Sequence, residues 1–599
     1  MSDGNIKRSG AKAPETSTES GPVLRLDHLN ISVNTEDGLR PLVHDLSFDL
    51  HRGETLAIAG ESGSGKSLTS LAIMGLLPPP AVRVTGGSIH FGEQELTTLG
   101  ESALRQIRGN RIAMIFQEPM TSLNPVMKIG TQLAEAICAH ESISFKDARA
   151  RALAALKSVR LSEPEKRLNQ FPHELSGGMR QRVMIAMALA LKPDILIADE
   201  PTTALDVTVQ REVLDLLRDL QREMGTALIL ITHDMGVVAE MADRVLVMKG
   251  GHFVEENDVV SLFSQPREAY TRDLLNAVPC LGDGLASASA NKPNEDPYVA
   301  ELENVVVRFN VRSGILGRVT HRVHAVENVS LNIRKGEIFS LVGESGCGKS
   351  TIAKAMVGLV KHSGRIRING IDISPPYGTI DNQVRREIQM VFQDPMASLD
   401  PRMRVGELVR EPLVIHGVGS VAEQKRRVEY LFERVGLSRD QIERYPHEFS
   451  GGQRQRICIA RALALNPKLI IADESVSALD VTVQAKVLVL LKELVSDLGV
   501  SFLFISHDMA VVENISDRVA VMYLGQIVEM GSCQQIFGTP RHSYTRRLIS
   551  AVPTADPTRE RQTLARLVGD VPSPVRLISE TVPHVTLENA GNGHMIAIE

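Results

Sequence analysis

The chain has 599 residues, which is too long for one hydrophobic core, and the usual size of domains predicts about four structural units. Its net charge of −6, from 66 basic and 72 acidic residues, argues against a general nucleic-acid-binding surface. The 43% apolar content is that of an ordinary globular protein, and no apolar run reaches the roughly 18 residues of a membrane span. If the protein works at a membrane, other chains must supply the spans.

Cysteine usage and the N-terminus give the next constraints. The five cysteines are scattered without Cys-x-x-Cys spacing, so neither a structural zinc site nor a disulfide framework is expected, and a reducing compartment fits. Residues 1–22 are rich in Ser, Thr, Gly and Lys and lack the apolar segment of a secretory signal. This composition predicts a disordered tail.

The sequence that follows alternates strands with helices. Alternating apolar residues from 23 to 33 predict strands, and the apolar run 55–59 leads into a glycine-rich loop and a helix. Charged helical sequence fills roughly 144–167, and two further apolar strands are expected at 195–198 and 227–231. This alternation indicates an α/β fold with a mostly parallel sheet.

The whole arrangement occurs twice. Residues 175–206 recur 274 residues later as 449–480, with 20 of 32 positions identical and no gap, so the chain is an internal duplication. We expect a first domain at 23–280, a Gly/Ala/Ser/Asn/Pro-rich linker at 281–298, a second domain at 299–555 and an extension at 556–599 whose role the sequence does not indicate.

Each copy contains a loop of the form GxxxxGK[ST] between an apolar strand and a helix. Backbone N–H groups wrap closely round phosphate oxygens only where glycine permits the dihedral angles, and a helix N-terminus also favours anions. The lysine of this motif reaches the β- and γ-phosphates, and the serine hydroxyl binds Mg²⁺. Two such loops in this context are improbable as chance turns. The predicted nucleotide-binding residues are Gly60, Glu61, Ser62, Gly63, Ser64, Gly65, Lys66 and Ser67, and Gly343, Glu344, Ser345, Gly346, Cys347, Gly348, Lys349 and Ser350.

An acidic pair ends the next apolar strand of each copy, Asp199–Glu200 and Asp473–Glu474. Such a pair is by itself more often a turn feature, but the upstream phosphate loop favours a catalytic interpretation. In phosphoryl transfer the aspartate holds the Mg²⁺ shell and the glutamate polarises the attacking water.

The order of phosphate loop, glutamine, Ser-Gly-Gly turn, acidic pair, Ala-Leu-Asp and histidine resembles the ATP-binding cassette ATPases. The resemblance covers about 23–553 and occurs twice. It implies two tandem P-loop nucleotide-binding domains, each with a RecA-like parallel-sheet core, an antiparallel β subdomain and a helical subdomain. The implied activity is ATP hydrolysis coupled to transport, with ATP and Mg²⁺ as cofactors.

The resemblance also gives roles to residues that alone would carry little meaning. A Ser-Gly-Gly turn that opens a helix offers a capping hydroxyl and free N–H groups, and in the family it faces the γ-phosphate held by the opposite cassette. The implied residues are the glutamines Gln117 and Gln393 near Mg²⁺, the γ-phosphate histidines His233 and His507, the interface aspartates Asp206 and Asp480, and the signature turns Ser176, Gly177 and Gly178 and Ser450, Gly451 and Gly452.

Two further motifs resemble one branch of the family, the dipeptide, oligopeptide, nickel and glutathione importers. They are the [ED]PMxSL[ND]P stretches at 118–125 and 394–401 and the Tyr-Thr-Arg motifs at Tyr270 and Tyr544. The branch implies two integral-membrane permeases and an extracytoplasmic solute-binding protein as partners. It also implies a peripheral location on the cytoplasmic face of a bacterial inner membrane, and it leaves the cargo open.

The two copies are not equivalent at the expected adenine position. Phe309 occupies the place where the family stacks an aromatic ring on the base, whereas the matching residue of the first copy is Val33. Met179 replaces the usual glutamine of the signature, and Ser475 replaces the proline found at Pro201. We expect both sites to hydrolyse ATP, with weaker binding at the first phosphate loop.

The alternative class is a soluble twin-cassette ATPase that acts on ribosomes or DNA. Ribosomal members have long charged helical linkers, and DNA-repair members carry zinc modules with paired cysteines; the short neutral linker and the scattered cysteines match neither. A complete exporter would need membrane spans. The importer subunit therefore remains the leading hypothesis.

Overall fold

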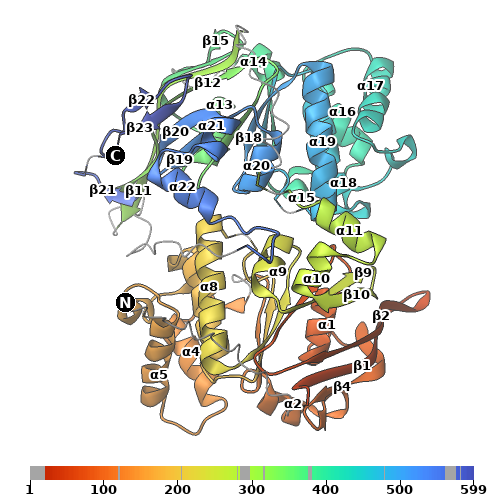
Figure 1. The fold of residues 1–599 in the computed structure, drawn as a ribbon. Coiled ribbons are helices and arrows are strands. Elements are labelled where there is room, and N and C mark those ends of the chain that lie inside the picture. The colour runs from red at the N-terminus through yellow and green to blue at the C-terminus, as the bar shows by residue number, and fades with distance from the viewer. Residues whose placement is uncertain are drawn as a thin grey trace, which may run out of the picture.

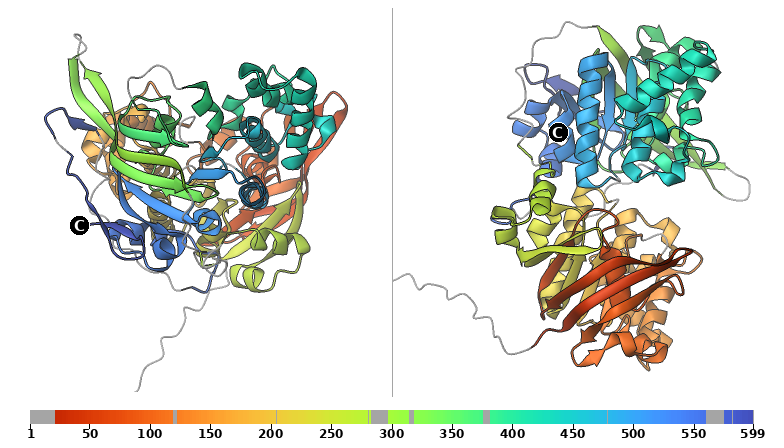
Figure 2. Two further views of the ribbon diagram at one scale, coloured as in Figure 1. Left: turned by 90° about the horizontal axis from the view of Figure 1, so that it is seen from above. Right: turned by 90° about the vertical axis from the view of Figure 1, so that its right-hand side faces the viewer.

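The computed structural model describes residues 21–118, 122–203, 205–279, 281–282, 297–313, 318–374, 381–477, 479–559, 575–580 and 582–598. The predicted tail at 1–22 and linker at 281–298 lie almost wholly outside these ranges, as does part of the 118–125 stretch. The chain forms two lobes, one for each copy of the repeat, stacked one above the other (Figures 1 and 2).

One ten-stranded sheet runs through the first lobe, in the order β5-β4-β1-β2-β10-β9-β3-β8-β7-β6. The strands from β9 to β6 are parallel, and β5, β4, β1 and β2 form an antiparallel part. Every residue of β3, β7 and β8 is buried, as the continuous apolar runs of a sheet covered on both faces require. The strands are β1 (Leu24–Thr35), β2 (Gly38–Leu50), β3 (Thr55–Ala59), β4 (Val82–Phe91), β5 (Gln94–Glu95), β6 (Ile112–Ile115), β7 (Ile195–Asp199), β8 (Ala227–Ile231), β9 (Arg244–Lys249) and β10 (His252–Asp258).

The helices of this lobe include a separate helical group, α4 to α7, which packs together beside the parallel strands (Figure 1). The charged segment expected as one helical stretch at 144–167 is two helices, because Arg160 and Glu163 adopt positive φ and Leu161 is buried between them. The helices are α1 (Lys66–Ile73), α2 (Glu101–Ile107), α4 (Ile129–Cys138), α5 (Phe145–Ser158), α6 (Pro164–Arg167), α7 (Gly177–Leu189), α8 (Val207–Met224), α9 (Met235–Met241), α10 (Val259–Ser264) and α11 (Ala269–Asn276).

The second lobe repeats this plan but divides its strands into two sheets, β15-β14-β11-β12-β21 and β16-β17-β18-β13-β19-β20-β23-β22. Its strands are β11 (Tyr298–Ser313), β12 (Arg318–Arg334), β13 (Ile338–Val342), β14 (Ser363–Ile368), β15 (Ile371–Asp372), β16 (Ile388–Val391), β17 (Leu469–Asp473), β18 (Ser501–Ile505), β19 (Arg518–Tyr523) and β20 (Gln526–Ser532). Its helices are α13 (Lys349–Met356), α14 (Asn382–Glu387), α15 (Pro395–Ser398), α16 (Val405–Ile415), α17 (Val421–Arg434), α18 (Gly451–Leu463), α19 (Val481–Leu498), α20 (Met509–Ile515), α21 (Cys533–Gly538) and α22 (Ser543–Ser550).

These two lobes confirm the predicted α/β class. Each has parallel central strands, an antiparallel part and a helical group, and each part is built from the corresponding segment of the repeat. The lobes meet through their C-terminal helices, since α11 packs against α19 and α22 packs against α8. Each lobe therefore contacts the other with an equivalent pair of helices.

The extension after 556, which the sequence left without a role, adds strands to the second lobe. β21 (Val575–Leu577) pairs with β12, and β23 (Met595–Ala597) pairs with β20 and with β22 (Leu587–Asn589). His594 Nε2 lies 2.8 Å from Oε1 of Glu529, and both side chains are buried, with exposed fractions of 4% and 0%. This contact attaches the extension to the core of the lobe.

We expect His594→Ala to destabilise the second lobe by about 1–3 kcal/mol, because it removes one hydrogen-bond partner from the buried carboxylate of Glu529. Thermal and urea unfolding of the full chain measure the change. His584→Ala is the matched control, since His584 is exposed on the same extension. Equal unfolding curves for the two variants would show that the His594 contact contributes nothing to stability.

Candidate active site

The two phosphate loops join β3 to α1 and β13 to α13. Gly60 and Gly343 have φ of 147° and 146°. A Cβ at Gly60 would lie 2.2 Å from the carbonyl oxygen of Met248 in the neighbouring strand, and a Cβ at Gly343 would lie 2.1 Å from that of Met522. Only glycine fits there. The first glycine of each motif is thus required by the close approach of its loop to the neighbouring strand.

The loop lysines are buried and point back along their loops. Lys66 Nζ donates to the carbonyl oxygens of Gly60 and Glu61, both at 2.7 Å. Lys349 Nζ does the same with Gly343 and Glu344, at 2.7 and 3.0 Å. Burial lowers the pKa of Lys66, and the carboxylate of Glu200 is the strongest influence that opposes it.

Each loop serine lies against the aspartate of the acidic pair. Ser67 Oγ donates to Asp199 at 3.1 Å, and Ser350 Oγ donates to Asp473 at 2.9 Å. Burial raises the pKa of Asp199 to about 6 and also raises that of Asp473, although the serine hydroxyls oppose it. One carboxylate and one hydroxyl are hard oxygen ligands of the kind that hold Mg²⁺ together with phosphate oxygens, so the residues fit this ion. Among the described residues there is no group of three or more His, Cys, Asp or Glu side chains for a metal bound by protein alone.

The glutamate of the first acidic pair collects three polar partners. Glu200 Oε2 accepts hydrogen bonds from Gln117 Nε2 and Thr203 Oγ1, both at 2.8 Å, and Oε1 lies 3.0 Å from His233 Nδ1. Burial by itself raises the pKa of Glu200, but the hydrogen bond and the charge of His233 outweigh it and hold the pKa at about 2. The same pairing outweighs burial at His233 and raises its pKa.

The second acidic pair has a looser version of this arrangement. Gln393 Nε2 donates to Glu474 at 2.7 Å, while His507 Nδ1 lies 3.6 Å from the other carboxylate oxygen. The contact with His507 lowers the pKa of Glu474 against the effect of burial. Ser477, which replaces Thr203, donates to the backbone carbonyl of Glu474 and not to its carboxylate.

The interface aspartates reach across to the loops of the opposite lobe. Asp480 accepts a hydrogen bond from the backbone N–H of Ser62 at 2.6 Å, and Asp206 accepts the equivalent bond from Ser345. The first turn of the following helix adds a second contact. Thr482 Oγ1 donates to Glu61 and Thr208 Oγ1 donates to Glu344, at 2.7 and 2.6 Å. The side chains of both loop glutamates are therefore directed at the other lobe.

The signature turns open α7 and α18. Ser176 caps α7 by accepting from the N–H of Met179, at 3.3 Å. Ser450 caps α18 in the same way, and Gln453 Oε1 also accepts from the Ser450 N–H at 3.0 Å, a return bond that Met179 cannot make. Both turns pack on the helix that follows the interface aspartate, since a Cβ at Gly178 would lie 2.5 Å from Val209.

The structure also supports the pairing of Val33 with Phe309. Each residue comes five positions after a residue of positive φ in the first strand of its lobe, His28 or Asn304. The Phe309 side chain is 44% exposed, so its ring is available to a ligand.

Several contacts at these sites were not predicted from the sequence. The phenols of Tyr270 and Tyr544 accept hydrogen bonds from the phosphate loops, although the tyrosines were noted only as markers of an importer branch. Arg547 lies 3.5 Å from Glu212 of the opposite lobe, which also binds Arg182 of the signature helix at 2.7 Å. The sequence signal that could have pointed to this contact is that Tyr270 and Tyr544 occupy equivalent positions in the two copies of the repeat.

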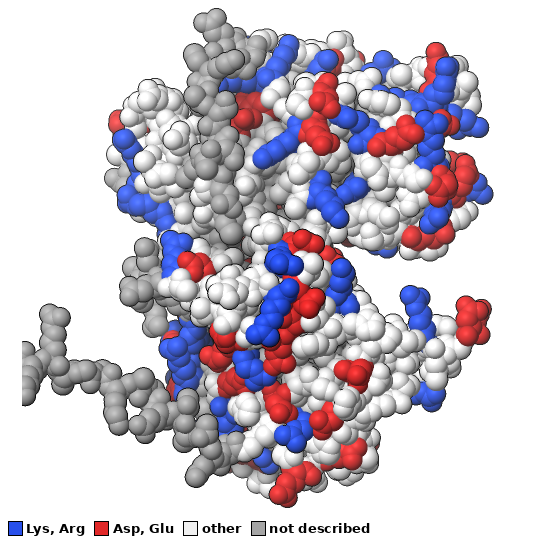
Figure 3. All heavy atoms as spheres, turned by 45° about the vertical axis from the view of Figure 1, so that its right-hand side comes forward, with Lys and Arg blue, Asp and Glu red and all other residues white. Residues whose placement is uncertain are grey.

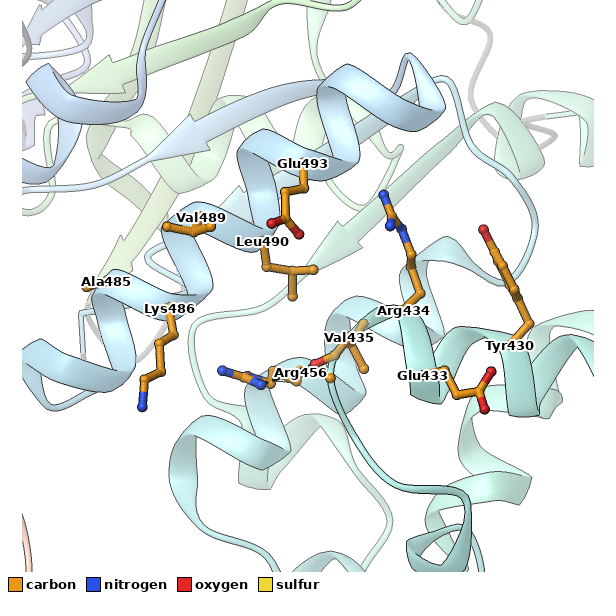
Figure 4. Close-up of a pocket in the computed structure, with 11 residues that line it drawn as sticks. Tyr430, Glu433, Arg434, Val435, Arg456, Ala485, Lys486, Val489, Leu490 and Glu493 are labelled. Carbon is orange, nitrogen blue, oxygen red and sulfur yellow. Dashed lines mark hydrogen bonds between the residues drawn. The ribbon is translucent and has the colours of Figure 1, made fainter. Parts of the chain in front are cut away.

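A separate cavity of about 700 Å³ lies between α17, α18 and α19 of the second lobe (Figure 4). Arg434, Arg456, Lys486 and Glu493 line it together with Val489, and none of its lining residues belongs to the predicted sites. In the face of the molecule seen in Figure 3, the described basic and acidic side chains are interspersed over both lobes. The described residues of that face form no continuous basic surface of the kind that binds nucleic acid.

The fold, with two phosphate loops each completed by the opposite lobe, defines a twin-cassette nucleotide-binding protein. A family profile described as ABC transporter matches residues 43–203 and 326–477, and one described as oligopeptide/dipeptide transporter, C-terminal region, matches 254–310 and 528–579. The chain belongs to the ABC transporter family, as an ATPase with two cassettes in one polypeptide.

Curated relatives match along almost the whole chain. A glutathione import ATP-binding protein, GsiA, of Pectobacterium atrosepticum is 51% identical, with 96% of each chain covered. The protein of the same name from Salmonella typhimurium is 50% identical, with 97% of each chain covered. In the part of the chain that the structure describes, no helix is both long enough and apolar enough to span a bilayer.

We expect Gly178→Ala to destabilise the first lobe by about 1–3 kcal/mol, because the added methyl group overlaps Val209 and separates α7 from α8. Gly177→Ala is the matched control, since a Cβ there meets open space. Thermal unfolding of the full chain measures both. Equal stability of the two variants would contradict this account of the signature glycines.

Proposed function

We propose that the chain is the ATP-hydrolysing subunit of an importer for a peptide-type solute, and that it energises transport through integral-membrane permeases. The observation that carries this proposal is the reciprocal contact of Asp480 with Ser62 and of Asp206 with Ser345. A nucleotide bound at either loop then lies at the contact of the two lobes. Binding and hydrolysis of ATP can therefore close and open the pair.

Each of the two composite sites takes residues from both lobes. Lys66, Ser67, Asp199 and Glu200 act on one ATP, over which the signature turn at Ser450 closes. The second site combines Lys349, Ser350, Asp473 and Glu474 with the signature turn at Ser176. The N–H groups and hydroxyl of each turn bind the γ-phosphate and add to the attraction between the lobes.

The glutamates orient the attacking water. A carboxylate with a pKa of about 2, as at Glu200, is ionised at neutral pH and is a weak base. It accepts a hydrogen bond from water and places that oxygen in line with the γ-phosphate, as a loose phosphoryl-transfer transition state requires. His233 and Gln117 hold the carboxylate in place. The serine of each phosphate loop and the aspartate of each acidic pair would hold Mg²⁺, which would supply positive charge to the phosphates.

Two grooves at equivalent positions are proposed as the permease contacts. In the second lobe a cavity of about 820 Å³ is lined by Phe392, Ser398 and His416 among others. In the first lobe a cavity of about 270 Å³ is lined by the corresponding Phe116, Ser122 and His140. The lining residues Phe116 and Phe392 immediately precede Gln117 and Gln393, so a permease helix seated there would move the residue that contacts the catalytic glutamate.

The relatives named for glutathione import make glutathione the first solute to test, with dipeptides and oligopeptides as the other members of the class. We propose that the complex also includes an extracytoplasmic solute-binding protein and that this chain lies on the cytoplasmic face of the inner membrane. Purification with two permease chains, followed by solute-stimulated ATPase assays in proteoliposomes, tests the proposal. Recovery of the chain with ribosomes and without permeases would favour the twin-cassette alternative.

The double variant Glu200→Gln/Glu474→Gln should retain ATP binding and lower the ATPase rate by about 100-fold or more, since loss of the group that orients an attacking water costs about this factor. The amide keeps the shape of the carboxylate but loses its charge. Turnover of Mg-ATP by the full chain, with nucleotide binding measured in parallel, gives the result. Wild-type turnover in the double variant would exclude the assigned role.

The Lys66→Ala variant, which retains the Phe309 site, should bind ATP about 5-fold or more tightly than Lys349→Ala, because an aromatic–base stack contributes about 1–3 kcal/mol. Titration with a fluorescent ATP analogue measures both affinities. Val33→Phe in the Lys349→Ala background should recover part of the difference. Equal affinities at the two surviving sites would contradict the prediction.

A further inference from the structure

The tyrosine of each Tyr-Thr-Arg motif contacts the phosphate loop of its own lobe. Tyr270 lies on α11 and accepts a hydrogen bond at its phenolic oxygen from the Glu61 N–H, at 3.3 Å. Tyr544 lies on α22 and accepts the equivalent bond from the Glu344 N–H, at 3.1 Å. The same contact occurs in two lobes whose sequences have diverged, so it is a property of the site and not of one loop.

The bonded N–H belongs to the peptide unit that also holds the loop lysine. In the first lobe this unit joins Gly60 to Glu61; its N–H donates to Tyr270, and its carbonyl oxygen accepts from Lys66 Nζ at 2.7 Å. A trans peptide is planar, with its N–H and C=O directed oppositely. The phenol therefore restrains this peptide plane through its N–H, and the carbonyl oxygen of the same plane positions the Lys66 ammonium group.

Because Gly60 has no side chain, the orientation of the adjoining peptide plane depends on contacts from other residues. Gly60 has φ of 147°, and a residue without Cβ offers little steric resistance to rotation of the adjoining peptide plane. The Tyr270 phenol supplies the restraint that a side chain at position 60 cannot. Gly343 and Tyr544 stand in the same relation in the second lobe.

The next N–H of the loop is held from the opposite lobe. Ser62 donates to Asp480, the residue just before α19, and α19 packs against the α11 helix that carries Tyr270. Two successive N–H groups are thus bonded by two elements that contact each other across the interface. In the second lobe, Ser345 donates to Asp206 at the start of α8, and α8 packs against α22.

Each tyrosine ring packs against a further side chain of its own lobe. The Lys249 ammonium lies 4.3 Å from the centre of the Tyr270 ring, and Tyr523, at the equivalent position of the second lobe, packs on Tyr544 with ring centres 4.4 Å apart. Burial raises the pKa of both tyrosines, so they remain neutral phenols at physiological pH. Each acts as a neutral hydrogen-bond acceptor for the loop.

We propose that Tyr270 and Tyr544 are positioning residues that orient the phosphate-loop lysines, and that docking of the opposite lobe completes this orientation. The inference rests on the proposed function, because it assumes that the lysines act on ATP. It adds that the C-terminal helix of each cassette links lysine geometry to contact between the lobes.

The first test replaces each phenol by a phenyl ring in the full chain. Tyr270→Phe and Tyr544→Phe keep the ring packing and remove the acceptor. We expect kcat for ATP hydrolysis to fall about 3- to 10-fold, the factor of one hydrogen bond, with KM and melting temperature nearly unchanged. Tyr430→Phe is the control, because Tyr430 is exposed on α17 beside the cavity of Figure 4, and it should behave as wild type.

The second test measures coupling across the interface. In a double-mutant cycle, Tyr270→Phe and Asp480→Asn act on the same loop, so their effects on kcat should be smaller together than the product of the two single effects. Tyr270→Phe and Asp206→Asn act on different loops, so their combined effect on kcat should equal the product of the two single effects. Independent effects in both pairs would overturn the link between the tyrosine and lobe docking.

The outcomes separate this inference from the proposed function. If wild-type protein hydrolyses ATP and the Lys66→Ala/Lys349→Ala variant does not, the loops act as proposed. Undiminished kcat in both phenylalanine variants would then overturn the role of the tyrosines alone. A fall in melting temperature large enough to account for the loss of activity would also overturn it, since the tyrosines would then only stabilise the fold.

Discussion

The constraint on which the rest of the structure depends is the supply of hydrogen-bond partners to the phosphate-loop N–H groups. A loop built for phosphate must leave its N–H groups unshielded, and those at its entry, from Glu61 and Ser62, are bonded by Tyr270 and by Asp480 of the other lobe. One lobe alone leaves the second of these donors without its acceptor. The duplicated chain thus provides within one molecule what each cassette lacks by itself.

The two sites share this plan and differ in how firmly it is held. Glu200, the first of the proposed catalytic glutamates, has a histidine at 3.0 Å and a threonine hydroxyl, whereas Glu474 has a histidine at 3.6 Å and, among the described residues, no hydroxyl bonded to its carboxylate. The signature that serves the first loop has the complete capping box at Ser450 and Gln453, and the other lacks the return bond. The chain combines the more firmly held glutamate with the site for which we propose weaker adenine binding, at Val33.

Local sequence was sufficient for much of this arrangement. The glycine loops, the acidic pairs and the buried strands follow from motif spacing and apolar runs, because their causes lie within a few residues. The helix break at Arg160 and the tyrosine contacts were not predictable in this way. Tyr270 and Glu61 are 209 residues apart, and no periodic pattern marks a single hydrogen bond between distant segments. Pairing of the extension with β12 and β20 depends likewise on the finished fold.

That extension has a consequence for how the second lobe behaves among its neighbours in a crowded cell. In the first lobe β2 and β10 pair at one position, His44 with His252, and this pair joins the two parts of the lobe into one sheet. In the second lobe β12 and β20 belong to different sheets joined by a hydrogen bond from the Glu327 N–H to the Gly525 carbonyl oxygen, at 2.8 Å, and each strand has a further border beyond that bond. β21 and β23 occupy those two borders. The C-terminal residues therefore cover strand edges of the second lobe, and an edge left open is the place where a strand of another chain can pair.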